Sequence, residues 1–183
     1  MSESFGPLDA DGWLAGATHI MSPNHDARPA GETVSLLVIH AISLPPGRFG
    51  GNAVIDLFTN RLAAAAHPDF AMLAGARVSA HFLVRRDGAL IQFVSCFARA
   101  WHAGVSCWKG RERCNDFSLG IELEGDDFTP FDDAQYATLG ALIERLRQSF
   151  SLVDIVGHAD IAAGRKTDPG PYFDWSRIPQ GTR

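Results

Sequence analysis

The period of apolar and polar residues changes along the chain, and two segments have the pattern of strands. Residues 34–42 are almost continuously apolar, which is typical of a strand covered on both faces. Residues 117–124 alternate strictly, so that one face of the expected strand is apolar and the other carries Glu122 and Glu124. Both segments are therefore expected to be strands of one sheet, the first covered on both faces and the second apolar on one face only.

Shorter strands and a hairpin are expected elsewhere. Residues 81–85 and 90–94 flank an Arg-Asp-Gly turn sequence, which predicts a β-hairpin. Residues 154–157 have the pattern of a last short strand, whereas residues 12–29 are rich in turn formers and are expected to be irregular.

Helical spacing is clearest after Asp132, where apolar residues recur every three or four positions to about residue 150. A shorter helix is expected over 53–59, with Asn52 as its cap. Residues 61–78 hold a short helix at best. Long irregular stretches in compact domains are often functional loops, and whether this one acts as a mobile lid stays open.

Strands and helices that intermix in this way predict an α/β fold with a mixed central β-sheet flanked by helices. The sequence contains no linker, repeat or low-complexity segment, and 183 residues suffice to bury a proper core. We therefore expect a single domain over residues 1–183.

Composition excludes several classes of function. A formal net charge of −5 disfavours nucleic acid as a partner, because neutralising phosphates needs a basic surface. No apolar run approaches the roughly 20 residues that span a bilayer, so no membrane partner is expected. The first residues lack the basic and apolar regions of a secretory signal, and three cysteines without close pairing are typical of reduced thiols. A cytoplasmic location is the expectation.

Two histidines and an aspartate have the chemistry of a hydrolytic metal site. His40 closes the most apolar run, His158 follows the strand expected over 154–157, and Asp168 lies in a loop stiffened by Pro169. Two imidazoles and one carboxylate can supply three corners of a zinc tetrahedron, which leaves the fourth for water.

Acid–base and electrophilic groups can be placed beside these ligands. A glutamate on the polar face of 117–124 could act as general base, but alternation does not decide between Glu122 and Glu124. Both could equally be charges on a solvent-facing side of the strand. Lys166, two positions before Asp168, could stabilise an oxyanion near the metal or be a plain surface lysine.

Several motifs in order along the chain resemble one family. The resemblance runs from about residue 12 to residue 175 and rests on the strand ending at His40 and on residues 77–81, 99–104, 110–116, 120–125 and 158–171. Together they resemble the zinc amidases that include phage lysozyme-amidases and peptidoglycan-recognition proteins, and within them the cytosolic AmpD-like amidases of Gram-negative bacteria.

The resemblance implies the site residues. It implies His40, His158 and Asp168 as zinc ligands, Glu122 as the general base and Lys166 as the electrophile. It further implies that Arg77 and Arg113 bind carboxylates of the substrate peptide, since guanidinium groups bind carboxylates in a bidentate manner. Trp101 would pack on the sugar.

The resemblance also implies a substrate and a reaction. The substrate would be a small anhydro-muropeptide, cleaved with Zn²⁺ at the amide between the lactyl group of 1,6-anhydro-N-acetylmuramic acid and L-alanine. The resemblance further implies a role in cell-wall recycling and in the control of β-lactamase induction. The sequence leaves open the oligomeric state and the preferred peptide length.

One position departs from the family pattern. The residue after the first ligand histidine is usually asparagine, and here it is Ala41. If the asparagine of the family helps to hold the substrate, this protein lacks one hydrogen bond to the substrate.

Three other functions compete with this interpretation. A non-catalytic peptidoglycan-binding module would have the same fold but would lack a zinc ligand. An amidase that acts on the intact cell wall would share the chemistry, and its activity on whole sacculi would distinguish it. A cysteine hydrolase using Cys107 or Cys114 would be sensitive to thiol alkylation.

Overall fold

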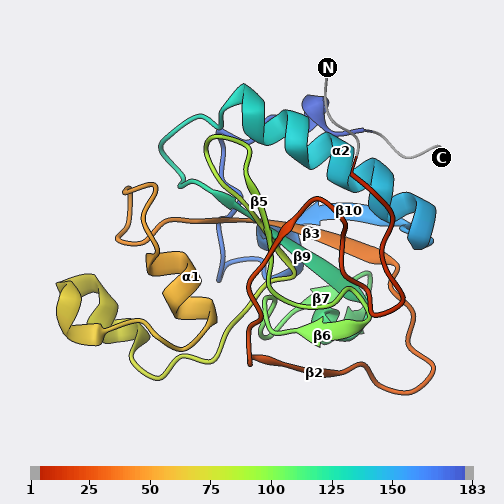
Figure 1. Ribbon diagram of the computed structural model, residues 1–183, viewed down its shortest axis with the longest axis horizontal. Coiled ribbons are helices and arrows are strands. Elements are labelled where there is room, and N and C mark those ends of the chain that lie inside the picture. Colours follow the sequence, from red (N-terminus) through yellow and green to blue (C-terminus); the bar gives the residue numbers. More distant parts are fainter. Residues whose placement is uncertain (1–4, 180–183) are drawn as a thin grey trace.

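The computed structural model describes residues 5–179 and centres on a six-stranded mixed sheet (Figure 1). Across the sheet the strands follow the order β1, β5, β4, β9, β3, β10. Their bounds are Thr18–His19, Leu90–Gln92, Phe82–Val84, Ser118–Glu124, Leu36–Ile42 and Asp154–Gly157. β9 pairs in parallel with β3 and β4, β10 with β3, and β1 with β5, whereas β4 and β5 are antiparallel. The expected mixed sheet and hairpin are confirmed.

The remaining elements are short apart from one helix. Two further ribbons pair β2 (His25–Ala27) with β6 (Ala98–Ala100) and β7 (Cys107–Trp108) with β8 (Arg111–Glu112). The α-helices are α1 (Ala53–Phe58), α2 (Asp133–Ser149) and α3 (His158–Ile161). The described residues also contain four 3₁₀ turns: η1 (Ala64–Ala66), η2 (Pro68–Leu73), η3 (Cys114–Asp116) and η4 (Trp175–Arg177). Within residues 5–179, none of the helices combines the length and apolar character that crossing a bilayer requires.

Helix α2 covers one face of the sheet (Figure 1). Its buried residues recur at the predicted helical spacing and pack on the odd-numbered residues of β3 and β9, in a cluster that includes Leu37, Ile39, Leu119, Ile121, Leu139 and Leu146. At the start of the helix, the backbone N–H of Asp132 donates to the side chain of Gln135. On β3 and β9 this face is therefore apolar.

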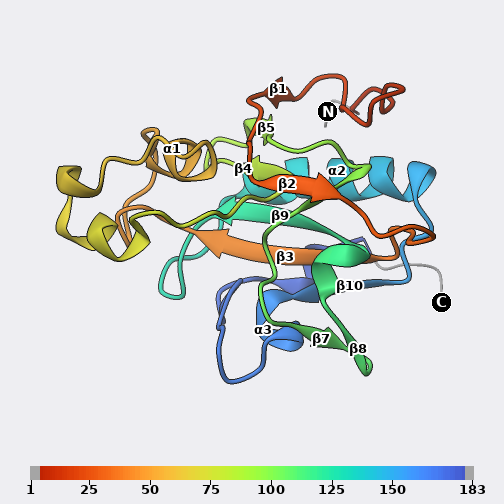
Figure 2. The same cartoon turned by 90° about the horizontal axis from the view of Figure 1, so that it is seen from below.

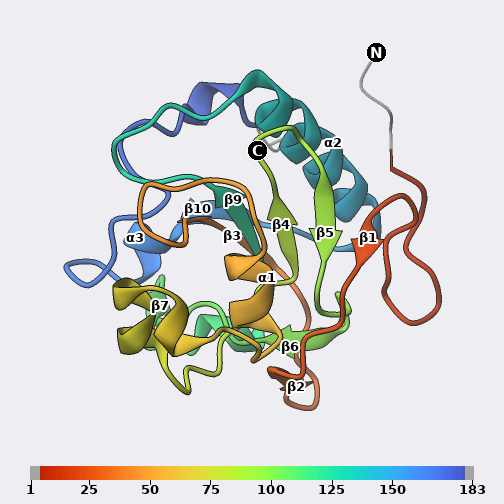
Figure 3. The same ribbon diagram turned by 60° about the vertical axis from the view of Figure 1, so that its left-hand side comes forward.

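The opposite face has two apolar regions with a polar strip between them. Figure 2 looks onto this face, with α1 toward one side and α3, β7 and β8 beside β10. Leu83 and Ile91 pack against α1, which lies across the sheet from α2 (Figure 3). Leu36 and Val38 pack with α3 and η3. The next residue on that face of β3 is His40, so the polar strip begins where the apolar contacts end.

The structure differs from the expected elements in three respects. Residues 12–29 contain β1 and β2, whose pairing partners lie about 75 positions away and leave no periodic pattern. Asn52 precedes α1, but its side chain makes no capping hydrogen bond. The polar face of β9 does not face solvent, because Glu122 is only 8% and Glu124 only 3% exposed.

Candidate metal centre

His40, His158 and Asp168 converge on one point at the polar strip. Gly157 is opposite Ile39 in the parallel pairing of β10 with β3, which brings the following His158 beside His40. Both histidines are buried, at 1% and 3% exposure. Among the described residues, these three side chains bring their ligand atoms within 4.8 Å of one another, close enough to hold one metal ion.

The donor atoms form a nearly equilateral triangle. The Nδ1 atoms of His40 and His158 are 3.0 Å apart, and Oδ2 of Asp168 lies 3.1 Å from the first and 3.0 Å from the second. Burial lowers the pKa of His40 to about 4, so the imidazole is neutral at physiological pH. Burial would raise the pKa of Asp168, but hydrogen bonding with His158 and His40 outweighs it and lowers that pKa. The triangle thus combines two imidazoles with an ionised carboxylate.

Glu122 lies beside this triangle, and one of its carboxyl oxygens has no hydrogen-bond partner. It is opposite His40 in the pairing of β9 with β3, and its Oε2 atom is buried and unpaired. Burial, and next the negative charge of Asp168, raise the pKa of Glu122 well above its ordinary value, while the positive charge of Lys166 opposes that shift. A raised pKa favours the protonated form, so a carboxyl group in this environment can act as a proton acceptor.

Glu124 has a different environment on the same face of the strand. Its Oε1 accepts a hydrogen bond from the backbone of Gly50 at 2.6 Å, and its Oε2 accepts from the backbone of Arg86 at 3.2 Å. The guanidinium of Arg85 lies 3.5 Å away. The carboxylate of Glu124 therefore anchors two loops, whereas Oε2 of Glu122 has no hydrogen-bond partner. The alternation of apolar and polar residues could not distinguish these two environments.

An open cleft lies next to the triangle. Its lining includes Ala41, Asp127, Phe128, Lys166 and Asp168. Lys166 is exposed, and its charge reaches both His40 and Glu122. The departure from the family pattern at Ala41 therefore falls on the wall of the cleft.

The three residues expected to bind substrate lie outside the triangle. Arg77 is exposed, and Trp101 donates from Nε1 to Asp26 at 3.2 Å. Arg113 pairs with Asp116 at 3.1 Å while its side chain stays 70% exposed. Their binding roles stay predictions.

His102 and Asn115, to which the sequence assigned no part in the metal site, lie directly behind the triangle. Nδ1 of His102 is 2.9 Å from Nε2 of His40, and the side chain of Asn115 accepts hydrogen bonds from the backbone of residues 102 and 103. The available signal was the placement of His102 within the 99–104 motif. The contact between His102 and His40 depends on the fold, so the spacing of residues in the sequence does not reveal it.

Comparison with known proteins places the chain in a family. Residues 30–171 match the family model described as N-acetylmuramoyl-L-alanine amidase. The chain is 56% identical over 170 residues to the 1,6-anhydro-N-acetylmuramyl-L-alanine amidase AmpD of Enterobacter cloacae, covering 92% of this chain and 91% of that protein. It is 55% identical over 169 residues to AmpD of Escherichia coli K12, covering 91% and 92%.

Solved structures agree with this assignment. A crystal structure of a selenomethionine AmpD derivative superposes with a TM-score of 0.92 at 54% identity, over 94% of this chain and 97% of that one. The amidase AmiD of E. coli, in complex with its substrate anhydro-N-acetylmuramic acid-L-Ala-D-γ-Glu-L-Lys, has a TM-score of 0.59 at 29% identity, over 94% and 64% of the two chains. The chain belongs to the N-acetylmuramoyl-L-alanine amidase family.

Proposed function

We propose that this protein is a zinc-dependent 1,6-anhydro-N-acetylmuramyl-L-alanine amidase. It would hydrolyse the amide bond between the lactyl group of 1,6-anhydro-N-acetylmuramic acid and the L-alanine of a stem peptide. One observation carries the proposal: a triangle of two imidazole nitrogens and a carboxylate oxygen lies beside the buried, unpaired carboxyl oxygen of Glu122. The names of the AmpD relatives and the substrate bound to AmiD support the choice of substrate.

The donor set of His40, His158 and Asp168 fits zinc. A tetrahedral ion with bonds of about 2.0–2.1 Å separates its ligand atoms by about 3.3 Å, close to the 3.0–3.1 Å between these atoms. Three protein ligands leave a position open, as in catalytic rather than structural sites. Zinc held there would supply Lewis-acid chemistry, lowering the pKa of a water and polarising the substrate carbonyl.

Glu122 would move the proton in this reaction. Its raised pKa allows it to accept a proton from the attacking water and to return it to the departing alanine nitrogen. A carboxylate already engaged in hydrogen bonds, such as Glu124, is poorly suited to either step.

Lys166 would stabilise the charge that develops on the carbonyl oxygen. Its ammonium group lines the cleft and acts electrostatically on the neighbouring Glu122, so a tetrahedral oxyanion formed there would be attracted to it. Arg77 and Arg113 would bind peptide carboxylates and Trp101 the sugar, whereas Ala41 offers no hydrogen bond.

The test is hydrolysis of anhydro-N-acetylmuramic acid-L-Ala-D-γ-Glu-L-Lys, followed by mass spectrometry, with zinc content measured in parallel. We expect release of the free peptide by the wild type and loss of both zinc and activity in Asp168→Ala. Asp174→Ala, which removes a carboxylate that accepts hydrogen bonds from Ser176, away from the triangle, should retain both.

Other outcomes would overturn the proposal in recognisable ways. Hydrolysis of intact sacculi in preference to the soluble substrate would identify a cell-wall amidase instead. Zinc binding without any hydrolysis would point to a binding module. Activity that persists without zinc but disappears on thiol alkylation would point to a cysteine hydrolase.

A further inference from the structure

Two consecutive residues contact both candidate histidine ligands from behind. Nε2 of His40 lies 2.9 Å from Nδ1 of His102, and Nε2 of His158 lies 3.1 Å from the carbonyl oxygen of Ala103. We infer that the His102-Ala103 dipeptide, held in place by Asn115, sets the tautomer and orientation of both histidines so that each directs an Nδ1 lone pair to the metal. The inference rests on the proposed zinc site.

The tautomer of His158 follows from its partner. A carbonyl oxygen only accepts hydrogen bonds, so the contact with Ala103 requires the proton on Nε2 of the imidazole. The neutral ring then has its lone pair on Nδ1, the atom that faces His40 and Asp168. One backbone carbonyl thereby selects the form of His158 that can bind a metal.

A hydrogen-bonded chain of His40, His102 and Ser118 permits the same form of His40. For Nδ1 of His40 to be a ligand, its Nε2 must carry the proton and donate to Nδ1 of His102. The proton of His102 is then on Nε2, which lies 3.1 Å from the hydroxyl oxygen of Ser118, a group able to accept it. Each nitrogen along this chain has a partner of matching character.

The position of the dipeptide is itself fixed. Oδ1 of Asn115 accepts from the backbone N–H groups of His102 and Ala103, at 3.2 and 2.9 Å. The imidazole of His102 lies against Gly120, where a Cβ atom would come within 2.5 Å of the ring. A side chain at residue 120 would thus displace the histidine that supports His40.

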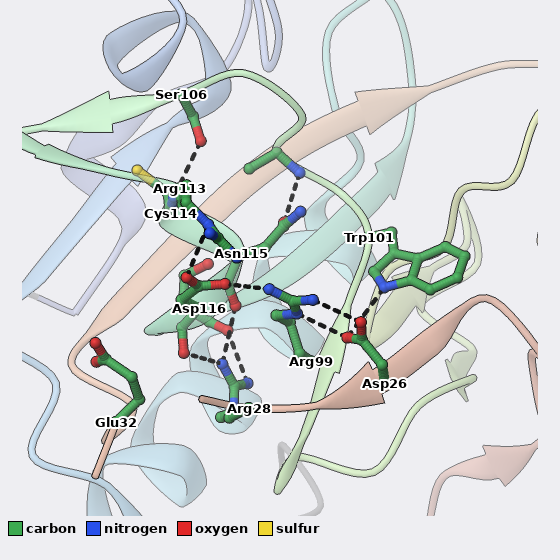
Figure 4. Close-up of polar contacts among 12 residues, drawn as sticks. Asp26, Arg28, Glu32, Arg99, Trp101, Ser106, Arg113, Cys114, Asn115 and Asp116 are labelled. Atoms are coloured by element: carbon green, nitrogen blue, oxygen red, sulfur yellow. Dashed lines mark hydrogen bonds and ion pairs between the residues drawn. The ribbon is translucent and has the colours of Figure 1, made fainter. Parts of the chain in front are cut away.

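The turn that carries Asn115 is anchored independently of the metal ligands. Arg28 donates to the carbonyl oxygens of Asn115 and Asp116, each at 3.0 Å, and Arg99 bridges Asp116 and Asp26 (Figure 4). The dipeptide therefore rests on a hydrogen-bonded support formed by Asp26 of β2, the following Arg28 and Arg99 of β6. This support explains how a loop residue can orient a buried ligand.

The experiment measures zinc affinity by competition with a chromophoric chelator, and the visible spectrum of the cobalt-substituted protein. His102→Leu removes the acceptor for His40 and should weaken zinc binding about 10- to 100-fold. His102→Asn keeps an acceptor oxygen near the Nδ1 position and should recover most of that loss. Asn115→Ala should also weaken zinc affinity and alter the cobalt spectrum.

Ser106→Ala is the matched control. Its hydroxyl accepts from the backbone of Cys114 in the same loop but touches neither residue 102 nor residue 103. It should lower thermal stability while leaving zinc affinity and the cobalt spectrum unchanged.

The outcomes separate this inference from the proposal on which it rests. A wild-type protein that binds no zinc would overturn both. A wild type that binds zinc, with His102→Leu and His102→Asn equally affected or equally unaffected, would overturn only the role of the dipeptide. If His102→Leu does not fold, equal zinc affinities for Asn115→Ala and Ser106→Ala would overturn it instead.

Discussion

Glu122 is directly opposite His40 where β9 runs parallel to β3, and both side chains project from the same face of the sheet. The pairing register thus places a buried carboxyl group beside a buried imidazole. Because one oxygen of Glu122 has no partner, the protein leaves a desolvated acid unsatisfied, which is costly for stability. Such a cost is common at functional sites, where a perturbed pKa is useful.

The first prediction concerns Glu122→Gln. The amide keeps the shape of the side chain but cannot carry the proton, so hydrolysis should fall about 10²- to 10⁴-fold. Zinc content should be unchanged, because Glu122 is not in the ligand triangle. The measurement is the rate of peptide release at fixed zinc occupancy, together with thermal unfolding.

Glu124→Gln is its control. This change weakens the acceptor for the backbone of Gly50 and Arg86, so it should lower stability by about 1 kcal/mol while the folded enzyme retains most of its activity. The reverse result, an inactive Glu124→Gln and an active Glu122→Gln, would show that Glu124 rather than Glu122 transfers the proton.

The sequence predicted β3, β9, β10, the hairpin of β4 and β5, and α2, because their periodicity is a local property. It did not predict the short strands β1, β2, β6, β7 and β8. The sequence also singled out His40, His158 and Asp168. The two histidines are close because β3 and β10 are neighbours, whereas Asp168 reaches them from the loop that follows α3. It could not separate Glu122 from Glu124, since the difference arises from loops that contact one carboxylate and not the other. It gave no part to His102, because a residue that supports a ligand has no spacing rule.

The second prediction concerns Gly120→Ala. The added methyl group would lie within 2.8 Å of three ring atoms of His102, so the imidazole must shift. We expect a loss of about 1–3 kcal/mol in the free energy of unfolding, and weaker zinc binding because His102 contacts His40. Chemical denaturation and chelator competition measure the two effects.

Gly140→Ala, within helix α2, offers the comparison, since among the described residues outside the helix its Cβ would meet only Pro179, at 3.9 Å. This variant should be more stable by about 0.5–1 kcal/mol, with unchanged zinc affinity. Equal zinc affinities for the two alanine variants would contradict the expected contact with the metal centre.

The third prediction concerns removal of the metal. A ligand that binds only the folded state stabilises it by about 2.7 kcal/mol when its free concentration is 100 times Kd. Chelation should therefore lower the melting temperature of the wild type, and added zinc should restore it. Asp168→Ala, which lacks one corner of the triangle, should respond weakly to either treatment; a full response would show that zinc binds elsewhere.

The fourth prediction concerns His81, which is fully buried beside β9. Its Nδ1 accepts from the backbone of Gly120 at 3.0 Å and its Nε2 lies 3.2 Å from the carbonyl of Ala98, so the ring is held neutral. Burial, and next the charge of Arg28, lower the pKa of His81 well below 6.5. Below pH 6.5 the unfolded chain therefore binds a proton at this histidine that the folded protein does not.

Folding stability should consequently fall as the pH decreases from 6.5, by up to about 1.4 kcal/mol per pH unit from this group alone. Glu122 acts with the opposite sign, since its raised pKa makes the folded state bind the additional proton. The contribution of His81 is thus best isolated as the difference between wild type and His81→Asn, measured by urea unfolding of chelated protein from pH 5 to 7.5. The variant should have the shallower dependence between pH 5 and 6.5. Ser79→Ala, a neighbouring buried change without a titrating group, should lower stability by the same amount at every pH, and equal slopes for all three proteins would contradict the neutral state of His81.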